Sequence, residues 1–125
     1  MQRNSLSLPD NIYRDKDGII QSLKECASEA IEGSEDIRKI ILFGSMARGD
    51  YGLYSDADVL IILNESKYGR YFERIPEFLD YFLDSKVPVD IFPYTVDEIE
   101  RMRKRGNALI TRALREGVVL AGWEG

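Results

Sequence analysis

The sequence predicts an α/β or α+β fold in which helices cover one small mixed sheet. Short runs rich in β-branched residues alternate along the chain with segments whose apolar residues recur at three- and four-residue steps. With 125 residues and 44% hydrophobic content, the chain has enough material for one core and too little for two. We therefore expect residues 15–125 to form a single domain, preceded by an arm over residues 1–14.

The first predicted element is a helix that begins at Asp17. Its apolar residues keep the helical spacing, and they are Ile19, Ile20, Leu23, Cys26, Ala27, Ala30 and Ile31. Gly33 is placed to end this helix. Cys26, the only cysteine, lies on the apolar face and is expected to be a small buried hydrophobic residue rather than a reactive thiol.

Three strands are expected next. Residues 37–43 and 59–63 are apolar at nearly every position, which is typical of interior strands covered on both faces. Residues 87–92 form the third, and Pro88 and Pro93 favour a short or edge position for it.

Helices are predicted between and after these strands. An apolar face runs through Phe72, Ile75, Phe78, Leu79, Phe82 and Leu83. Since a proline inside a helix removes a hydrogen bond, regular helix is expected to start near Pro76.

Two shorter helices and a last strand are expected at the C-terminal end. Thr95 and Glu98 have capping-box spacing and predict a helix to about Arg105. Asn107 can cap another helix, which Gly117 would end. The residues of that helix expected to face inward are Leu109, Ile110, Ala113 and Leu114. Residues 118–121 complete the pattern as a strand.

Composition limits the function classes. No apolar stretch approaches the roughly 20 residues of a membrane helix, and a cytoplasmic location follows by default. The net charge of −5 argues against general nucleic-acid binding. Because histidine is absent, catalysis would rest on carboxylates, hydroxyls, Lys, Arg or Tyr.

Three aspartates are candidate metal ligands. Asp56 and Asp58 stand at the start of an apolar strand, where alternation places them on one face about 7 Å apart. Asp90 interrupts another apolar strand in the same way. Unpaired anions side by side destabilise a fold, and hard oxygen ligands favour Mg²⁺ or Mn²⁺. The pattern predicts a cation at this place.

A small-residue turn, Gly44-Ser45, ends the first strand. Glycine lets a phosphate approach the backbone, and the N–H groups at the start of a short helix favour an anion. If this turn and the Asp56/Asp58 pair serve one metal-bound nucleotide, the first two strands must be antiparallel. The sheet is then mixed, unlike an all-parallel Rossmann sheet.

Taken together, Gly44-Ser45, ten intervening residues and Asp56-x-Asp58, followed by the strand-borne Asp90, form a specific combination. It resembles the minimal nucleotidyltransferase family of the DNA polymerase β superfamily, whose signature is Gly-Ser-x10-Asp-x-Asp. Two further matches are Ala47-Arg48-Gly49 and Ser55, and the resemblance spans roughly residues 18–120. It implies a polymerase β-like nucleotidyltransferase fold.

The resemblance also implies a chemistry and a ligand set. A nucleoside monophosphate would move from a nucleoside triphosphate to an acceptor, with two Mg²⁺ or Mn²⁺ ions held by Asp56 and Asp58 and one of them also by Asp90. Asp90 could take the acceptor proton. Gly44 and Ser45 would hold the β and γ phosphates. Arg48 could reach a phosphate, pair with a site carboxylate or form a structural ion pair.

The acceptor is expected to come from another protein, because the chain has no room for a second, acceptor-binding domain. Minimal chains of this kind commonly accompany HEPN-domain toxins, so the resemblance implies an antitoxin that places AMP from ATP on a tyrosine of its partner. Two alternatives stay open. One is a non-catalytic nucleotide-binding module that neutralises its partner by occlusion, and the other is transfer to RNA or a small molecule. Homodimerisation through free sheet edges is also open.

Two further features have both a structural and a functional interpretation. Residues 101–115 contain only basic charges, on Arg101, Arg103, Lys104, Arg105, Arg112 and Arg115. They are either solvated helix faces or a docking surface for an acidic partner or RNA. Tyr51 and Tyr54 either pack within their loop or stack on a base at the site.

Overall fold

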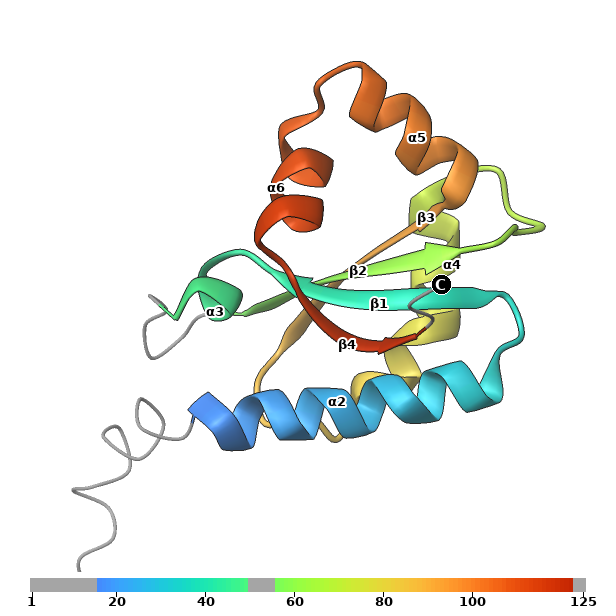
Figure 1. The fold of residues 1–125 in the computed structure, drawn as a ribbon. Helices are drawn as coiled ribbons and strands as arrows, with labels where there is room; N and C mark the ends of the chain where they lie inside the picture. The colour runs from blue at the N-terminus through green and yellow to red at the C-terminus, as the bar shows by residue number, and fades with distance from the viewer. Residues whose placement is uncertain (1–15, 50–55, 123–125) are drawn as a thin grey trace, which may run out of the picture.

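A computed structural model of the chain describes residues 16–49 and 56–122, and it contains a four-stranded sheet with the order β3-β2-β1-β4 (Figure 1). The strands are β1 (Ile37–Phe43), β2 (Ala57–Leu63), β3 (Val89–Thr95) and β4 (Val118–Gly122). β1 is antiparallel to both β2 and β4, whereas β2 and β3 are parallel. The predicted mixed sheet with an antiparallel first pair is confirmed. The expected arm 1–14, Tyr51, Tyr54 and Ser55 lie outside the described residues.

Helices cover both faces of this sheet (Figure 1). One face carries α2 (Lys16–Gly33), α4 (Tyr71–Leu79) and the 3-10 helix η1 (Asp80–Phe82). The other carries α5 (Val96–Lys104) and α6 (Ala108–Glu116). The single-turn helix α3 (Ser45–Arg48) follows β1 at one end of the sheet. None of the helices in the described ranges is long and apolar enough to cross a membrane.

A separate apolar cluster fills each side of the sheet. Under α2, Leu23 and Ala27 pack with Val59 and Ile61 from β2. On the opposite side, Ile110 of α6 packs with Ile41 of β1 and Leu60 of β2, whose side chains point away from α2. Burial on both faces explains why residues 40–43 and 59–63 are continuous apolar runs, and both strands are central, as predicted. Cys26 is buried in the α2 cluster, and burial raises the pKa of its thiol.

The prediction that regular helix starts near Pro76 is wrong. α4 begins at Tyr71 and runs through Pro76, which is exposed. The missing proline N–H costs one helical hydrogen bond. The start of α4 is held because Glu73 Oε1 accepts from the Arg70 N–H at 3.2 Å and Arg74 is tied to neighbouring segments.

The buried face of this region also differs from the prediction. Phe72 and Leu83 of the predicted apolar face are 53% and 71% exposed. The buried residues are Arg74, Phe78 and Phe82, one every four positions. That spacing is helical, and Phe78 and Phe82 of the predicted face are buried as expected. A charged residue occupies the first place of the spacing, so a pattern based on apolar residues alone put Phe72 and Leu83 on the buried face in error.

The third strand lies later than predicted, at Val89–Thr95 instead of 87–92. Its edge position is confirmed by the strand order. Pro93 lies within the strand because an edge strand has one side on which an N–H needs no sheet partner.

The two C-terminal helices have the predicted caps. The Thr95 hydroxyl accepts from the Glu98 N–H at 3.2 Å, and Glu98 Oε1 accepts from the Thr95 N–H at 2.9 Å. Asn107 Oδ1 accepts from the Ile110 N–H at 3.0 Å. Leu114, expected to face inward, is instead 43% exposed on α6.

Candidate active site

The turn after β1 and the starts of β2 and β3 meet at one end of the sheet. In the β1–β2 pairing, Phe43 is opposite Asp58. In the β2–β3 pairing, Asp58 is opposite Asp90. Gly44 therefore lies beside Asp58, and two predicted site carboxylates occupy neighbouring positions on adjacent strands. The Ala57 N–H donates to the Pro88 carbonyl at 2.8 Å and fixes the start of this pairing.

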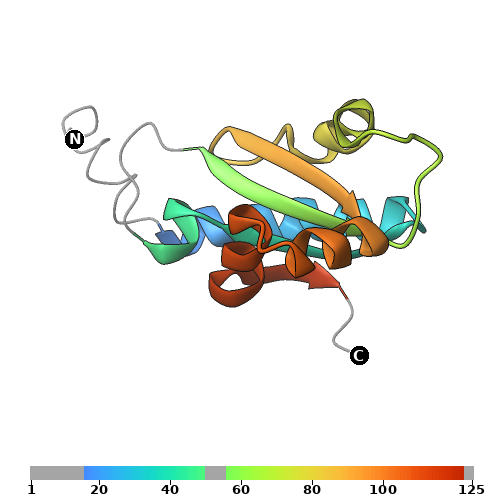
Figure 2. The same ribbon diagram turned by 90° about the horizontal axis from the view of Figure 1, so that it is seen from above.

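Asp58 and Asp90 share the face of the sheet that carries α5 and α6. Ala57 and Val59 point into the cluster under α2, so alternation turns Asp58 to the opposite face. On β3, Ile91 packs in the α2 cluster and Phe92 packs on the α5/α6 side. Asp90 is two residues before Phe92, so it lies on the same side as Phe92. Neither helix crosses over the N-terminal ends of β2 and β3 (Figure 2). The site is open to solvent, with Asp90 exposed and Asp58 half-buried.

The interactions of Asp58 with the described residues disfavour its charged form. Burial raises the pKa of Asp58 above its ordinary value of 3.8, and the charges of Asp90 and Asp56 raise it further. Asp56 immediately precedes β2 and is exposed. The three carboxylates are thus close enough to repel one another, which is the condition under which a bound cation stabilises a site.

Gly44 makes room for Asp58. A Cβ atom at position 44 would lie 2.5 Å from Asp58 Oδ2, closer than real Cβ contacts. The backbone angles of Gly44, φ 80° and ψ −158°, are also in a region that is essentially restricted to glycine. The turn therefore requires glycine for two reasons: its backbone conformation and the closeness of the carboxylate.

α3 begins directly after this glycine. Met46 is 1% exposed and anchors α3 in the α2 cluster, and the Gly49 N–H closes the turn by donating to the Ser45 carbonyl at 2.9 Å. Ser45 is half-buried at the first helical position. N–H groups in the first turn of a helix have no intrahelical acceptor, so this turn presents donors beside Asp58.

Arg48 extends from α3 toward α6. Its Nη1 atom lies 3.9 Å from Glu116 Oε1, and both side chains are about 40% exposed. Of the roles considered for Arg48, the structure thus shows an ion pair with a residue that is not one of the three aspartates.

The donor chemistry of the site fits a hard divalent cation. Carboxylate oxygens of Asp56, Asp58 and Asp90 are ligands that Mg²⁺ and Mn²⁺ prefer, and the space beside Gly44 would be filled by any Cβ. Among the described residues, no three His, Cys, Asp or Glu side chains already stand in a metal-binding cluster.

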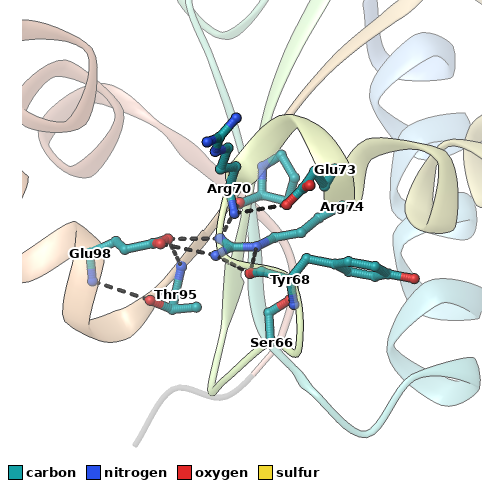
Figure 3. Close-up of polar contacts among 8 residues, drawn as sticks. Ser66, Tyr68, Arg70, Glu73, Arg74, Thr95 and Glu98 are labelled. Atoms are coloured by element: carbon teal, nitrogen blue, oxygen red, sulfur yellow. Dashed lines mark hydrogen bonds and ion pairs between the residues drawn. The ribbon is translucent and has the colours of Figure 1, made fainter.

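Sequence reasoning missed a polar cluster at the other end of β3 (Figure 3). Arg74 is 2% exposed, and its guanidinium donates to both Glu98 oxygens at 2.7 and 2.9 Å. It also donates to the Tyr68 carbonyl at 2.8 and 3.1 Å and to the Pro93 carbonyl at 3.0 Å. These hydrogen bonds join four segments and hold the pKa of Glu98 below its ordinary value. The four-residue spacing of Arg74, Phe78 and Phe82 is the one pattern that could have revealed it.

A pocket of about 400 Å³ lies beside this cluster, between the start of α4, Tyr94 of β3, and α5 with the residues that follow it to Asn107. Arg101 and Arg105, two of the six basic residues noted in the sequence, line it. The basic segment is therefore divided, since Arg112 and Arg115 are exposed on α6 outside the pocket lining and Arg103 pairs with Glu100.

A four-stranded mixed sheet with this turn and these paired aspartates defines a polymerase β-like nucleotidyltransferase fold. The chain belongs to the nucleotidyltransferase domain family, whose sequence profile matches residues 20–119. The family suggested by the Gly-Ser-x10-Asp-x-Asp pattern is thereby confirmed.

Two curated relatives are similar in sequence. The bifunctional uridylyltransferase/uridylyl-removing enzyme of Pseudomonas entomophila is 32% identical over 92 residues, 74% of this chain and 10% of that protein. "Putative protein adenylyltransferase MJ0141" of Methanocaldococcus jannaschii is 47% identical over 47 residues, 38% of this chain and 46% of that protein. The chain thus spans less than half the length of either relative in these matches.

Two solved structures share the fold. A Sulfolobus solfataricus protein described as a "putative nucleotidyltransferase" superposes with a TM-score of 0.61 at 20% identity, covering 95% of this chain and 89% of that one. A chain from a toxin-antitoxin structure with AMP-PNP superposes with a TM-score of 0.54 at 20% identity, covering 81% and 74% of the two chains. At this identity the likeness concerns the fold alone.

Proposed function

We propose that this protein is a metal-dependent nucleotidyltransferase that moves AMP from ATP to a hydroxyl group of a partner protein. The observation that carries the proposal is the register that sets Asp58 opposite Asp90 and beside the Gly44 turn. A group of neighbouring carboxylates next to a glycine turn is suited to a triphosphate with its cations. Domain-family membership supports the reaction class.

In this proposal each site residue has a defined task. Gly44 and Ser45 hold the β and γ phosphates through backbone N–H groups and the Ser45 hydroxyl. Asp56 and Asp58 hold two Mg²⁺ or Mn²⁺ ions, and Asp90 holds one of them. When bound, these ions would neutralise charge on the triphosphate and lower the pKa of the acceptor hydroxyl.

The bond changes follow from this placement. The acceptor oxygen forms a bond to the α-phosphorus, and the bond from that phosphorus to the oxygen bridging to the β-phosphate breaks. Pyrophosphate leaves with those electrons. Asp90 receives the acceptor proton, a task for a carboxylate in a chain without histidine. Arg48, whose Nη1 atom lies 3.9 Å from Glu116 Oε1, is assigned to the nucleotide as a candidate phosphate contact.

AMP and a protein acceptor are favoured by the relatives' names. The M. jannaschii protein carries the name "Putative protein adenylyltransferase MJ0141", and the toxin-antitoxin structure contains AMP-PNP, an ATP analogue. With the resemblance to minimal nucleotidyltransferases, these names support an antitoxin that adds AMP to a tyrosine of a HEPN-domain toxin.

A mass measurement tests this proposal. The protein is incubated with ATP, Mg²⁺ and the HEPN-domain protein of its own organism, and the partner is weighed. We expect a mass gain of one AMP that needs both the metal and Asp58. An unmodified partner that gains no mass would contradict the proposal.

Toxin neutralisation and the fate of labelled AMP separate the alternative functions of the site. If Asp56→Ala/Asp58→Ala abolishes transfer but neutralises the toxin as well as the parent protein does, occlusion is the mechanism. If labelled AMP appears on RNA or on a small molecule instead of protein, the reaction class stands and the acceptor is wrong.

A further inference from the structure

The pocket at the C-terminal end of β3 combines aromatic rings with basic side chains. We propose that it docks an acidic segment of the acceptor protein, with an apolar side chain of that segment inserted between the rings and the α5 residues. This inference rests on the proposed function, because it assigns a docking place to the proposed acceptor.

The apolar part of the pocket is built from the start of α4 and the end of β3. Tyr71 stacks on Tyr94 with ring centroids 5.0 Å apart, and it meets Phe72 edge to face at 5.9 Å. Tyr71 is 37% and Phe72 53% exposed, although both line a concave surface together with Met102. Exposed aromatic side chains in a hollow are characteristic of protein-binding surfaces.

The charged part of the pocket is positive. Arg70, Arg101 and Arg105 line it, and all three are exposed. Among the described residues of the lining, Glu98 is the one acidic side chain, and both of its oxygens already accept from Arg74. Within the described ranges, neither Arg101 nor Arg105 has an ion-pair partner. The pocket therefore offers cations that a carboxylate-rich segment can pair with.

A protein segment fits this pocket better than a nucleic acid does. The ring faces that would stack on bases are partly in use, since Tyr71 stacks on Tyr94 and the Arg70 guanidinium lies 5.9 Å from the centre of the Phe72 ring. The whole chain carries a net charge of −5, which repels a long polyanion, whereas a short acidic segment meets only the local positive charge.

The pocket lies within reach of the carboxylate site. Asp90 and Tyr94 are on the same face of β3, four residues apart, which is about 13 Å along a strand. An extended segment anchored beside Tyr94 would thus need about four residues to bring a hydroxyl to Asp90. The edge strand β3 can therefore carry the docking pocket at Tyr94 and the reaction site at Asp90.

Charge reversal at the pocket tests the inference. In Arg101→Glu/Arg105→Glu, we expect KM for the HEPN-domain acceptor to rise about tenfold while kcat at saturating acceptor and KM for ATP change less than about twofold, because docking acts before the chemical step. Lys104→Glu/Arg112→Glu is the matched control, since it reverses two exposed charges of the same segment outside the pocket lining and should leave KM unchanged. Phe72→Ala, at an exposed position, should raise KM without a change of net charge.

A second readout does not depend on transfer. The ¹⁵N-labelled protein is titrated with the peptide Asp-Glu-Phe-Asp-Glu and, separately, with decauridylate. We expect the peptide to shift the amides of Tyr71, Met102 and Arg105, and to do so far less in Arg101→Glu/Arg105→Glu. No peptide binding, shifts elsewhere, or a stronger response to decauridylate at these amides would overturn the inference.

The two proposals fail separately. If the parent protein transfers AMP and the pocket variant has an unchanged KM for the acceptor, the docking inference is wrong and the proposed function stands. If the parent protein transfers no AMP to the partner, the proposed function is wrong, and the peptide titration alone decides whether the pocket binds acidic segments.

Discussion

The two ends of β3 treat charge in opposite ways. At the N-terminal end, Asp58 and Asp90 stand side by side, and the burial of Asp58 together with the charge of Asp90 raises the pKa of Asp58. At the C-terminal end, Arg74 is almost fully buried, yet its hydrogen bonds lower the pKa of Glu98. Charges that serve the fold are paired within the chain, whereas charges kept beside like charges are suited to an external ligand.

Removing the carboxylate of Asp58, at the end of the sheet that is open to solvent, should have the largest effect on activity. Asp58→Asn should lower the rate of AMP transfer roughly 10³-fold, because an oxygen that acts on the transferring phosphate is lost. Without metal the variant should unfold at the same or a higher temperature, since the repulsion is relieved. Labelled ATP and thermal melts in EDTA measure the two effects. Asp36→Asn, at an exposed position on the other end of the sheet, is the control, and transfer at the parent rate by Asp58→Asn would refute the assignment.

Substitutions in the Arg74–Glu98 pair at the C-terminal end of β3 should lower the stability of the protein rather than its activity. Arg74→Met leaves the Tyr68 and Pro93 carbonyl groups without the guanidinium donor and Glu98 without its cationic partner, and we expect the free energy of unfolding in urea to fall by about 3–5 kcal/mol. Adding Glu98→Gln should recover part of this loss, because the uncompensated charge is then removed. If Arg74→Met unfolds at the same urea concentration as the parent protein, the pair does not hold these segments together.

Gly44 combines a backbone conformation that favours glycine with a position directly beside Asp58. Gly44→Ala should destabilise the protein by about 2 kcal/mol, because its conformation is nearly restricted to glycine and a Cβ meets Asp58 Oδ2 at 2.5 Å. Gly106 is the matched control, with a φ of +75° and, among the described residues, no neighbour within 4 Å of the place a Cβ would take. Gly106→Ala should cost only the backbone part, about 1 kcal/mol. Equal losses of unfolding free energy in the two variants would mean that the contact between the new Cβ and Asp58 does not contribute to the destabilisation.

The pH dependence of stability should have opposite signs at the two ends. In metal-free buffer at pH 7 the parent protein should be less stable than Asp58→Asn. That deficit should shrink as the pH falls through the raised pKa of Asp58 and vanish below 3.8, the ordinary value. The parent should be more stable than Glu98→Gln at pH 7, and this advantage should disappear below about pH 4.5, as the pH falls through the lowered pKa of Glu98. Urea unfolding from pH 7 to 3.5 measures both, and slopes of the same sign would contradict the contrast.

The smallest effect is expected at Arg48. Its exposed pair with Glu116 should contribute less than about 1 kcal/mol to stability. If Arg48 contacts a phosphate, Arg48→Gln should raise KM for ATP roughly tenfold while Glu116→Gln leaves it unchanged. Equal changes in KM for the two variants would leave Arg48 as a structural partner of Glu116 only.

Local patterns were sufficient for most of the fold. The three- and four-residue apolar spacing located α2, and nearly continuous apolar runs rich in β-branched residues located β1 and β2, because those patterns reflect which faces are buried. The errors arose where a distant contact overrides local preference. Pro76 lies inside α4 because Arg74 and its partners hold the helix, and those partners come from β3 and α5.

The candidate site shows the same division. The glycine turn, the carboxylates and their spacing along the chain could be recognised without a structure, since backbone conformation and ligand chemistry are properties of single residues and short motifs. Three-dimensional packing was needed to show that Asp90 stands opposite Asp58, that Arg74 is buried with Glu98, and that Tyr71 meets Tyr94 beside Arg101. These contacts join residues far apart in the chain, and their closeness depends on strand register and helix packing. A local pattern such as the four-residue spacing of Arg74, Phe78 and Phe82 can mark a buried face, but it does not identify the distant partner of each residue.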